Sequence, residues 1–275
     1  MEPGAFAYVC ADVPGVRPFI NLKDRQLQQM VDQTQYAVAS LYLPEYFPNA
    51  TRRYQLASWG SYPSSKVKMA LGVSKDWEKK HSDIAQADYW FSAQGGLSVS
   101  MTGNRAFISA AAWDTPDDPP DPFSAAPGTA MPEGFNEFRK GALIACWFEK
   151  PAPLINKKLA EMEIPLEIPA ERVFFCLTPA AGQTESGDEQ RYEGQLRIEA
   201  ASAAQTRALT SLFAIARRFL AFNASSFKAD AGGPAALAAM FLVNPPVPNG
   251  KYLNIKTRPL SGGEISLLLS AFSLY

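Results

Sequence analysis

The sequence predicts an α+β fold with mixed sheets and packed amphipathic helices, arranged as two pseudo-repeated α/β halves. Short strand-like runs alternate along the chain with segments of helical period, which is typical of a sheet that carries helices. A stretch rich in proline and aspartate interrupts this order, and a similar order of strands and helices then follows. We therefore expect a first half at 1–113, a linker at 114–134 and a second half at 135–275.

The composition is that of a folded chain with little charge. Of 275 residues, 47% are hydrophobic and 19% are charged. A chain of this length can bury a sizeable core without disulfide bonds. The net charge of -1 argues against nucleic-acid binding, which needs a basic surface. No apolar run approaches the roughly 20 residues that a transmembrane helix needs.

The first elements of the first half are a strand, a helix and a second strand. Residues 5–13 form an apolar, β-prone run. Apolar residues then recur at helical spacing, which predicts a helix over 24–43 that ends before Pro44. Residues 54–59 are the next expected strand.

The rest of the first half is predicted from alternation and turn signals. Apolar residues at 67, 69, 71 and 73 alternate with other residues, which predicts a half-buried strand. A charged helix is expected over 74–87. Residues 89–94, 97–101 and 107–113 are strand-like, and the sequence Thr-Gly-Asn-Arg between the last two predicts a hairpin turn.

The second half begins with strands at 142–148 and 173–177, separated by a short helix at 154–162. A strand around Leu196 and Ile198 leads into a long helix at 202–222. The strand 251–257 precedes a last helix, which begins at Ser261 because Ser261 and Glu264 have the spacing of a capping box. The apolar face of this last helix comprises Ile265, Leu268, Leu269 and Phe272.

The sequence lacks the residues and motifs of most catalytic and metal-binding sites. The one histidine, His81, lies in a charged stretch and is expected to be a surface residue. The sequence holds no nucleophile elbow, phosphate-binding loop or dinucleotide fingerprint. Asp117, Asp118 and Asp121 lack the spacing of a calcium loop. We expect neither a cofactor nor a metal, and no enzymatic activity.

The three cysteines are expected to be buried thiols. Cys10, Cys146 and Cys176 each lie in an apolar, strand-like run, and their odd number does not suit a disulfide framework. The alternative from the same residues is a disulfide bond between Cys146 and Cys176.

The helix expected over 202–222 is amphipathic in an unusual way. Its apolar residues cover about 180° of the helical wheel, wider than the stripe of about 100° that a core-packed helix needs. Its opposite face carries Arg207, Arg217 and Arg218, and no acidic residue occurs from 200 to 229. A wide apolar face with a basic polar face is typical of helices that lie in a membrane interface. The alternative is a helix buried by a sheet on one side and a second helix on another.

Three segments resemble a known family. They are the opening FAYVCADVPGVRPF, the strand and helix RYEGQLRIEAASAAQTRALTSLFAIARRFLAF, and the ending LSGGEISLLLSAFSLY. The chain resembles the treponemal outer-membrane-associated lipoproteins that bear amphipathic, membrane-inserting helices. The resemblance implies an acylated N-terminus, a place on the periplasmic leaflet of the outer membrane, and lipid binding or membrane perturbation. The sequence itself has no lipobox around Cys10.

The function that we expect is non-enzymatic binding to membrane lipids, preferentially anionic ones, with no nucleic-acid partner. Two other functions stay open at this point: a soluble carrier of a lipid-like ligand in an apolar cavity, and a hydrolase whose site has no recognisable motif. The residues expected to meet lipid are Arg207, Leu212, Phe213, Ile215, Arg217, Arg218, Phe219, Leu220, Phe222, Leu268, Leu269 and Phe272.

Overall fold

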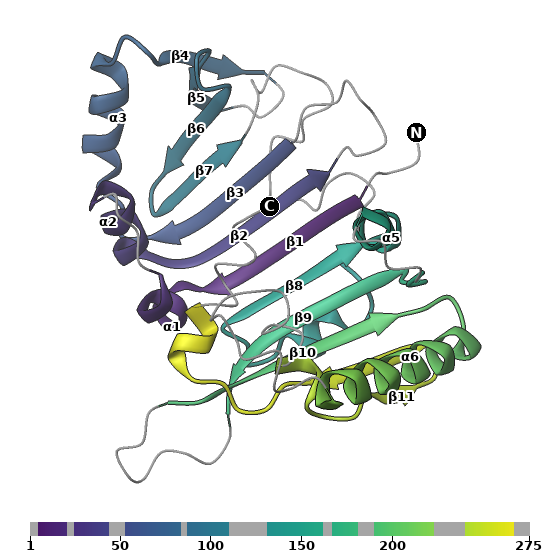
Figure 1. The fold of residues 1–275 in the computed structure, drawn as a ribbon. Coiled ribbons are helices and arrows are strands. Elements are labelled where there is room, and N and C mark those ends of the chain that lie inside the picture. Colours follow the sequence, from purple (N-terminus) through teal and green to yellow (C-terminus); the bar gives the residue numbers. More distant parts are fainter. Residues whose placement is uncertain are drawn as a thin grey trace. The chain divides into compact units, whose positions relative to one another are not determined.

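The computed structural model describes residues 5–20, 25–43, 53–83, 87–109, 131–161, 167–180, 190–222 and 240–266. The chain forms two compact units (Figure 1), one of Met1–Arg17 with Asn21–Phe138 and one of Pro18–Ile20 with Arg139–Tyr275. Most of the expected linker, residues 114–130, lies outside the described residues.

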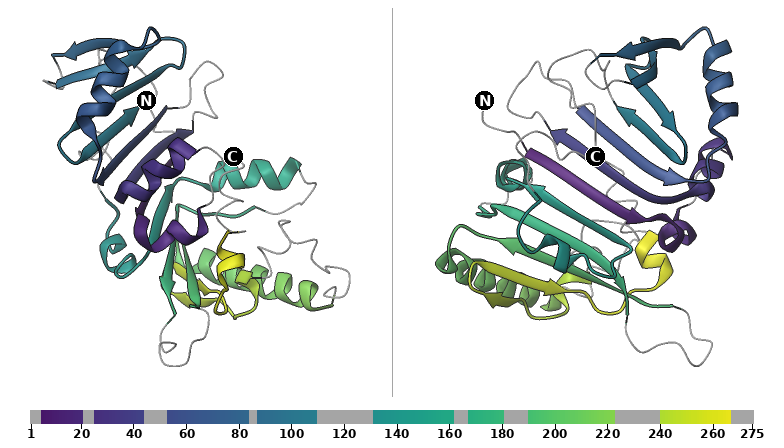
Figure 2. Two further views of the ribbon diagram at one scale, coloured as in Figure 1. Left: turned by 90° about the vertical axis from the view of Figure 1, so that its left-hand side faces the viewer. Right: turned by 180° about the vertical axis from the view of Figure 1, so that it is seen from behind.

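The first unit contains a sheet with the strand order β1-β2-β3-β7-β6-β5-β4. Its strands are β1 (Ala5–Asp12), β2 (Thr34–Leu43), β3 (Arg53–Gly60), β4 (Glu78–Ser82), β5 (Ala87–Ser92), β6 (Leu97–Thr102) and β7 (Arg105–Ser109). Its helices are α1 (Val13–Val16), α2 (Arg25–Gln33), α3 (Ser64–Val73) and α4 (Phe135–Phe138). The short 3-10 helix η1 (Arg17–Phe19) follows α1 in the sequence, and its residues from Pro18 onward belong to the second unit. Figure 2 shows α3 on one face of strands β4–β6.

The second unit contains a sheet with the order β11-β12-β10-β9-β8. Its strands are β8 (Ile144–Glu149), β9 (Arg172–Pro179), β10 (Tyr192–Glu199), β11 (Val247–Asn249) and β12 (Tyr252–Lys256), and its helices are α5 (Ala152–Glu161) and α6 (Ala203–Phe222). Helix α6 packs on β11 and β12. A cluster of buried apolar residues in this unit lies between α6 and the sheet.

The α+β class is confirmed, but the sheets are not mixed. Within each unit, the strand pairs of the described residues are antiparallel. Short turns such as the one between β6 and β7 permit antiparallel neighbours, whereas parallel pairs need long crossovers. In that turn Gly103 has a φ of +59°, which a glycine adopts without strain. The pseudo-repeat of the two halves stays a prediction.

The helix expected over 24–43 is wrong in its second half. Helix α2 ends at Gln33, and strand β2 begins at Thr34, between β1 and β3. The Thr34 hydroxyl donates a hydrogen bond to the carbonyl of Met30, 2.8 Å away, at the end of the helix. The residues that follow are mostly apolar or aromatic, and pairing with a strand on each side decides their conformation.

The next two predictions are also wrong. Residues 64–73 form helix α3 instead of a strand. None of its residues is buried, so the alternating apolar residues do not form the buried face of a sheet. Residues 78–82, expected within a helix, form β4 at the edge of the sheet. Its charged side chains suit an edge strand, since they discourage pairing with another chain.

The three cysteines are buried thiols, as the sequence predicts, and no disulfide joins Cys146 to Cys176. Burial raises the pKa of the Cys176 thiol to about 11, which keeps it protonated at neutral pH.

A line of charged residues crosses the second sheet. The register places Glu149, Arg172 and Glu199 opposite one another on β8, β9 and β10. Arg172 Nε donates to both carboxylate oxygens of Glu149, at 2.9 and 2.8 Å. Glu199, whose side chain is only 6% exposed, accepts from Arg172 Nη1 at 3.1 Å and from Lys251 Nζ at 2.6 Å. The buried carboxylate is therefore fully paired, as burial of a charge requires.

The capping box expected at Ser261 is confirmed. Glu264 accepts from the Ser261 backbone N–H at 2.9 Å, and the Glu264 N–H donates to Ser261 Oγ at 3.4 Å. Residues 262–266 are helical, and Ile265 is fully buried. Glu264 also forms an ion pair with Arg258. The hydrogen bonds from Arg258 and Ser261 hold the pKa of the Glu264 carboxyl below its usual value of 4.5.

Replacing this carboxylate, as Glu264→Ala, is expected to lower the free energy of unfolding by about 1 kcal/mol at pH 7. Because the folded-state pKa is depressed, this stabilisation is present above pH 4.5 and is lost as the pH falls through the folded-state value. Urea unfolding at pH 7 and pH 3 measures the difference between parent and variant at each pH. The exposed Glu137→Ala is the control, and an undiminished difference for Glu264→Ala at pH 3 would contradict the prediction.

Candidate lipid-binding face of helix α6

Helix α6 is long because nothing in its sequence interrupts it. Its 20 residues, Ala203–Phe222, contain neither glycine nor proline and are mostly good helix formers. Ser202 caps its start, since the Gln205 N–H donates to Ser202 Oγ at 3.3 Å. The helix predicted from the sequence is thus confirmed over its whole length.

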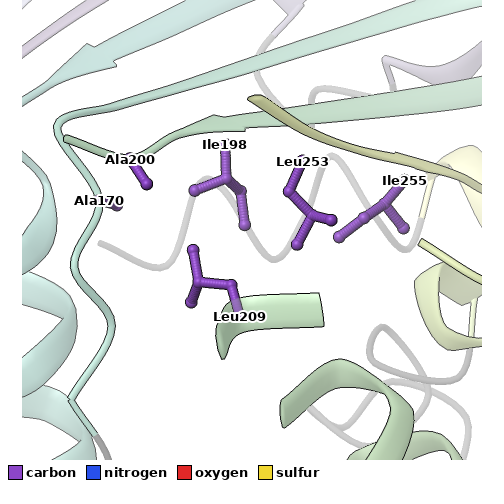
Figure 3. Packing of buried hydrophobic residues seen from close by; sticks show 6 residues of the cluster. All are labelled: Ala170, Ile198, Ala200, Leu209, Leu253 and Ile255. Atoms are coloured by element: carbon purple, nitrogen blue, oxygen red, sulfur yellow. The ribbon is translucent and has the colours of Figure 1, made fainter. Parts of the chain in front are cut away.

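One side of α6 belongs to the core of the second unit. Leu209 is 1% exposed and packs against Ile198, Leu253 and Ile255. Figure 3 shows these three sheet side chains pointing toward Leu209. Leu212 and Phe213, which the sequence places among the lipid-binding residues, are half-buried against the same core cluster.

The opposite side of α6 is exposed and basic. Arg207, Ser211, Ile215 and Arg218 follow at spacings of four, four and three residues, so they lie along one side of the helix. All four are exposed, and Ile215 is 62% exposed although it is apolar. We call these four residues the α6 face. The α6 face therefore exposes two cationic groups and one apolar side chain to the solvent.

Arg217 differs from Arg207 and Arg218 because its guanidinium is hydrogen-bonded to the backbone of a neighbouring segment. Arg217 Nε donates to the Leu242 carbonyl at 2.8 Å, and Nη2 donates to the Val243 carbonyl at 3.1 Å. Arg217 therefore attaches the segment after residue 240 to α6. The structure does not place it on the α6 face.

Six other expected lipid contacts lie outside the part that the structure describes. They are the side chains of Phe219, Leu220 and Phe222, and all of Leu268, Leu269 and Phe272. Two exposed residues beside α6 are absent from the expected set: Val243, whose carbonyl Arg217 contacts, and Val247 of β11. Val243 ends an apolar run and Val247 lies between two prolines, so neither belongs to a periodic pattern by which the sequence could identify it.

The described residues hold no group of three or more histidine, cysteine or acidic side chains that could bind a metal ion. Every helix among them is too short or too polar to span a bilayer. The carboxyls of Asp88 and Glu264 both have pKa values below the usual range, because Lys79 and Arg258, respectively, are hydrogen-bonded to them. Both carboxyls are therefore ionised at neutral pH and are poor proton donors.

His81 lies at the surface, as expected from the sequence. Its side chain is 53% exposed, and its Nδ1 lies 2.8 Å from Asp88 Oδ1. His81→Ala is expected to change the free energy of unfolding by less than about 0.5 kcal/mol, because exposed pairs contribute little. Urea unfolding at pH 7 measures this, and a loss above 2 kcal/mol would contradict it.

The comparisons with known proteins concern the fold. No family model matches the chain, and no curated protein matches its sequence. Crystal form III of TP0453, a Treponema pallidum protein, superposes with a TM-score of 0.57 at 15% identity, covering 98% of this chain and 95% of that chain. Crystal forms IV and I give TM-scores of 0.55 and 0.52, each at 14% identity and covering 98% of this chain and 94% of TP0453. This chain is therefore similar in fold to TP0453 over nearly its full length.

Proposed function

We propose that this chain is a non-enzymatic bacterial envelope protein that docks on anionic membrane lipids through the α6 face. The observation that carries the proposal is the exposure of Arg207 and Arg218 beside the exposed Ile215. The sequence from 200 to 229 contains no acidic residue that would oppose this charge. Cationic groups next to an apolar side chain match the headgroup region of an anionic bilayer.

Docking through this face needs no rearrangement of the core. The half of α6 that holds Leu209 and Phe213 remains on the sheet, while the opposite half meets lipid. Deeper insertion would remove Leu209 from Ile198 and Leu253 and expose those residues. Surface docking is therefore the first step of the proposal, and any perturbation of membrane permeability would follow from a second, larger rearrangement.

The expected strength of this docking is modest. Each basic residue near an anionic surface contributes about 1 kcal/mol, and burying part of Ile215 adds roughly another 1 kcal/mol. A total near 3 kcal/mol corresponds to a Kd of about 6 mM, so this face alone binds weakly and reversibly, and its binding is measured with lipid at millimolar concentration. An acyl chain, which the resemblance to treponemal lipoproteins implies, would be a suitable second anchor. The periplasmic leaflet of the outer membrane as the location is part of this proposal and rests on that resemblance.

Vesicle flotation tests the proposal. The chain should float with vesicles containing phosphatidylglycerol at low salt and much less with pure phosphatidylcholine vesicles. Raising the salt to 0.5 M should weaken the binding, because exposed charges are already screened over about 10 Å at 0.1 M. Ile215→Ser should weaken binding to both vesicle types without unfolding the protein, since the side chain is exposed. Failure to float with any vesicle at neutral and mildly acidic pH would reject the proposal.

A further inference from the structure

An asparagine is followed by a glycine in the hairpin that joins β11 to β12. Asn249 is the last residue of β11, and Gly250 and Lys251 form the turn that leads to Tyr252, its partner across the hairpin. The φ of Gly250 is +60°, a value that the turns of short hairpins require and that glycine adopts without strain. Every other asparagine in the sequence is followed by a residue with a side chain.

The two groups at this junction that could react with each other are free. Within the described part of the chain, neither the Asn249 carboxamide nor the Gly250 N–H makes a hydrogen bond, and both residues are exposed. The other side of the turn is held in place. The Lys251 carbonyl accepts the Ala200 N–H at 2.9 Å, and the Lys251 ammonium pairs with Glu199 at 2.6 Å. The turn is therefore fixed at Lys251 and unrestrained at Asn249 and Gly250.

Strand β11 can release Asn249 at little cost. The strand has three residues, all of them exposed, and it lies at the edge of the sheet, where it pairs with β12 alone. Pro248 contributes no N–H to the ladder. For its side chain to reach the next backbone nitrogen, Asn249 must leave the extended conformation, which disrupts only its own pair with Tyr252. Local openings of this kind cost far less free energy than global unfolding.

We propose that Asn249 is a site of deamidation in the folded protein, with water as the co-reactant and isoaspartate as the main product. The Gly250 nitrogen loses its proton to hydroxide and attacks Cγ of Asn249, which closes a succinimide ring. The side-chain nitrogen takes a proton from water and leaves as ammonia. Water then opens the ring. Opening at the backbone carbonyl gives isoaspartate, and opening at Cγ gives aspartate. Glycine favours the attack because it has no Cβ to hinder its nitrogen.

The modification alters the hairpin on which helix α6 packs (Figure 1). Isoaspartate carries the chain through its side chain and so adds one methylene to the main chain. The register pairs Val247 with Asn254 and Asn249 with Tyr252, and an extra main-chain atom in β11 cannot satisfy both pairs. The product also adds a negative charge next to Lys251 in the sequence. Deamidation therefore weakens the pairing of β11 with β12, whether or not α6 docks on membranes.

Peptide mapping of the full chain after incubation at 37 °C and pH 8 tests the proposal. Trypsin releases residues 229–251 as one peptide, which contains Asn249 and also Asn244. We expect Asn249 to gain the mass difference between a hydroxyl and an amino group, with more isoaspartate than aspartate. Asn244 is an internal control, because Pro245 has no N–H that could lose a proton and attack. Conversion should be slower at pH 6, where less of the Gly250 nitrogen is deprotonated.

Three comparisons can overturn the proposal. Asn104 is also exposed and lies in a hairpin turn, but Arg105 follows it, so it should convert at least about tenfold more slowly than Asn249. Asn249→Gln should suppress the acidic product, because its ring would be larger and closes more slowly. The proposal fails if Asn249 and Asn104 convert equally, or if Asn249→Gln forms the acidic product at the parent's rate. It also fails if folding slows conversion more than about a hundredfold relative to the chain in 8 M urea, since the hairpin then protects Asn249.

Asn249→Asp separates the effect of the charge from that of the longer main chain. It adds the same carboxylate without the methylene, so hydrogen exchange in β11 and β12 should remain that of the parent. The same amides should exchange at least about tenfold faster in the incubated protein, once isoaspartate has formed, because their pairing is lost. Equal exchange in the incubated protein and in Asn249→Asp would contradict the proposed change in the hairpin.

Discussion

Reversing both arginines of the α6 face, as Arg207→Glu with Arg218→Glu, is expected to abolish binding to anionic vesicles. Each reversal removes an attraction of about 1 kcal/mol and introduces a repulsion of similar size, about 4 kcal/mol in all. Both side chains are exposed, so the free energy of unfolding should change by less than about 0.5 kcal/mol. Flotation across a series of vesicle concentrations gives the affinity, and urea unfolding gives the stability.

The control for this variant has the same net charge elsewhere. Lys66→Glu with Lys75→Glu also converts two exposed cations to anions, but in the first unit. If binding depends only on the total charge of the protein, both double variants will lose affinity equally, and the α6 face will have no special role. A loss confined to the α6 variant, and small on neutral vesicles, is the result that the proposal requires.

Local signals were sufficient for α6 and for the start of the last helix. A run of 20 residues without glycine or proline, with a serine before it, specifies a helix whatever surrounds it. The spacing of Ser261 and Glu264 likewise specifies a cap through contacts between residues three positions apart. The sequence also predicted which side of α6 is polar, and the exposure of Arg207 and Arg218 agrees with that.

Non-local contacts decided the elements that the sequence predicted wrongly. Residues 34–43 have a helical apolar period, yet two neighbouring strands pair with them along their length. Apolar residues alternate in 64–73 as they do in a strand, but the strands of the sheet are formed by other segments, and residues 64–73 form a helix. Hydrophobic period alone cannot distinguish these cases, because the free energy that decides them comes from residues distant in the sequence.

The wide apolar arc of α6 illustrates the same limit for the candidate site. Leu212 and Phe213 were grouped with Ile215 because all three lie in one arc of the helical wheel. The structure divides that arc: the first two contact the core cluster, and Ile215 is exposed. A helical wheel gives the direction of a side chain but not the position of the sheet beneath it, so only the structure separates core residues from those available to lipid.

Gly60 is a position whose importance no sequence pattern indicates, and Gly60→Ala is expected to lower the free energy of unfolding by about 2–4 kcal/mol. Gly60 ends β3 where the chain passes the end of α2. A Cβ atom there would overlap the carbonyl oxygen of Gln33 and lie 3.0 Å from the Cα of Thr34. That carbonyl accepts the Ser61 N–H at 2.9 Å, and the Gly60 N–H donates to Asn104 at 2.9 Å. Because all of these atoms belong to the backbone, no side chain can move aside to relieve the overlap.

Urea unfolding of Gly60→Ala against Gly72→Ala measures this effect with a matched substitution. At Gly72, in helix α3, a Cβ atom meets nothing within 4 Å, so the same change is expected to stabilise the protein by roughly 0.5–1 kcal/mol through the helix propensity of alanine. The two variants should therefore move the unfolding midpoint in opposite directions. If Gly60→Ala unfolds at the parent's urea concentration, the close approach of β3 to the end of α2 is not as tight as the structure has it. Strands β2 and β3 would then tolerate a side chain at the point where helix α2 gives way to the sheet.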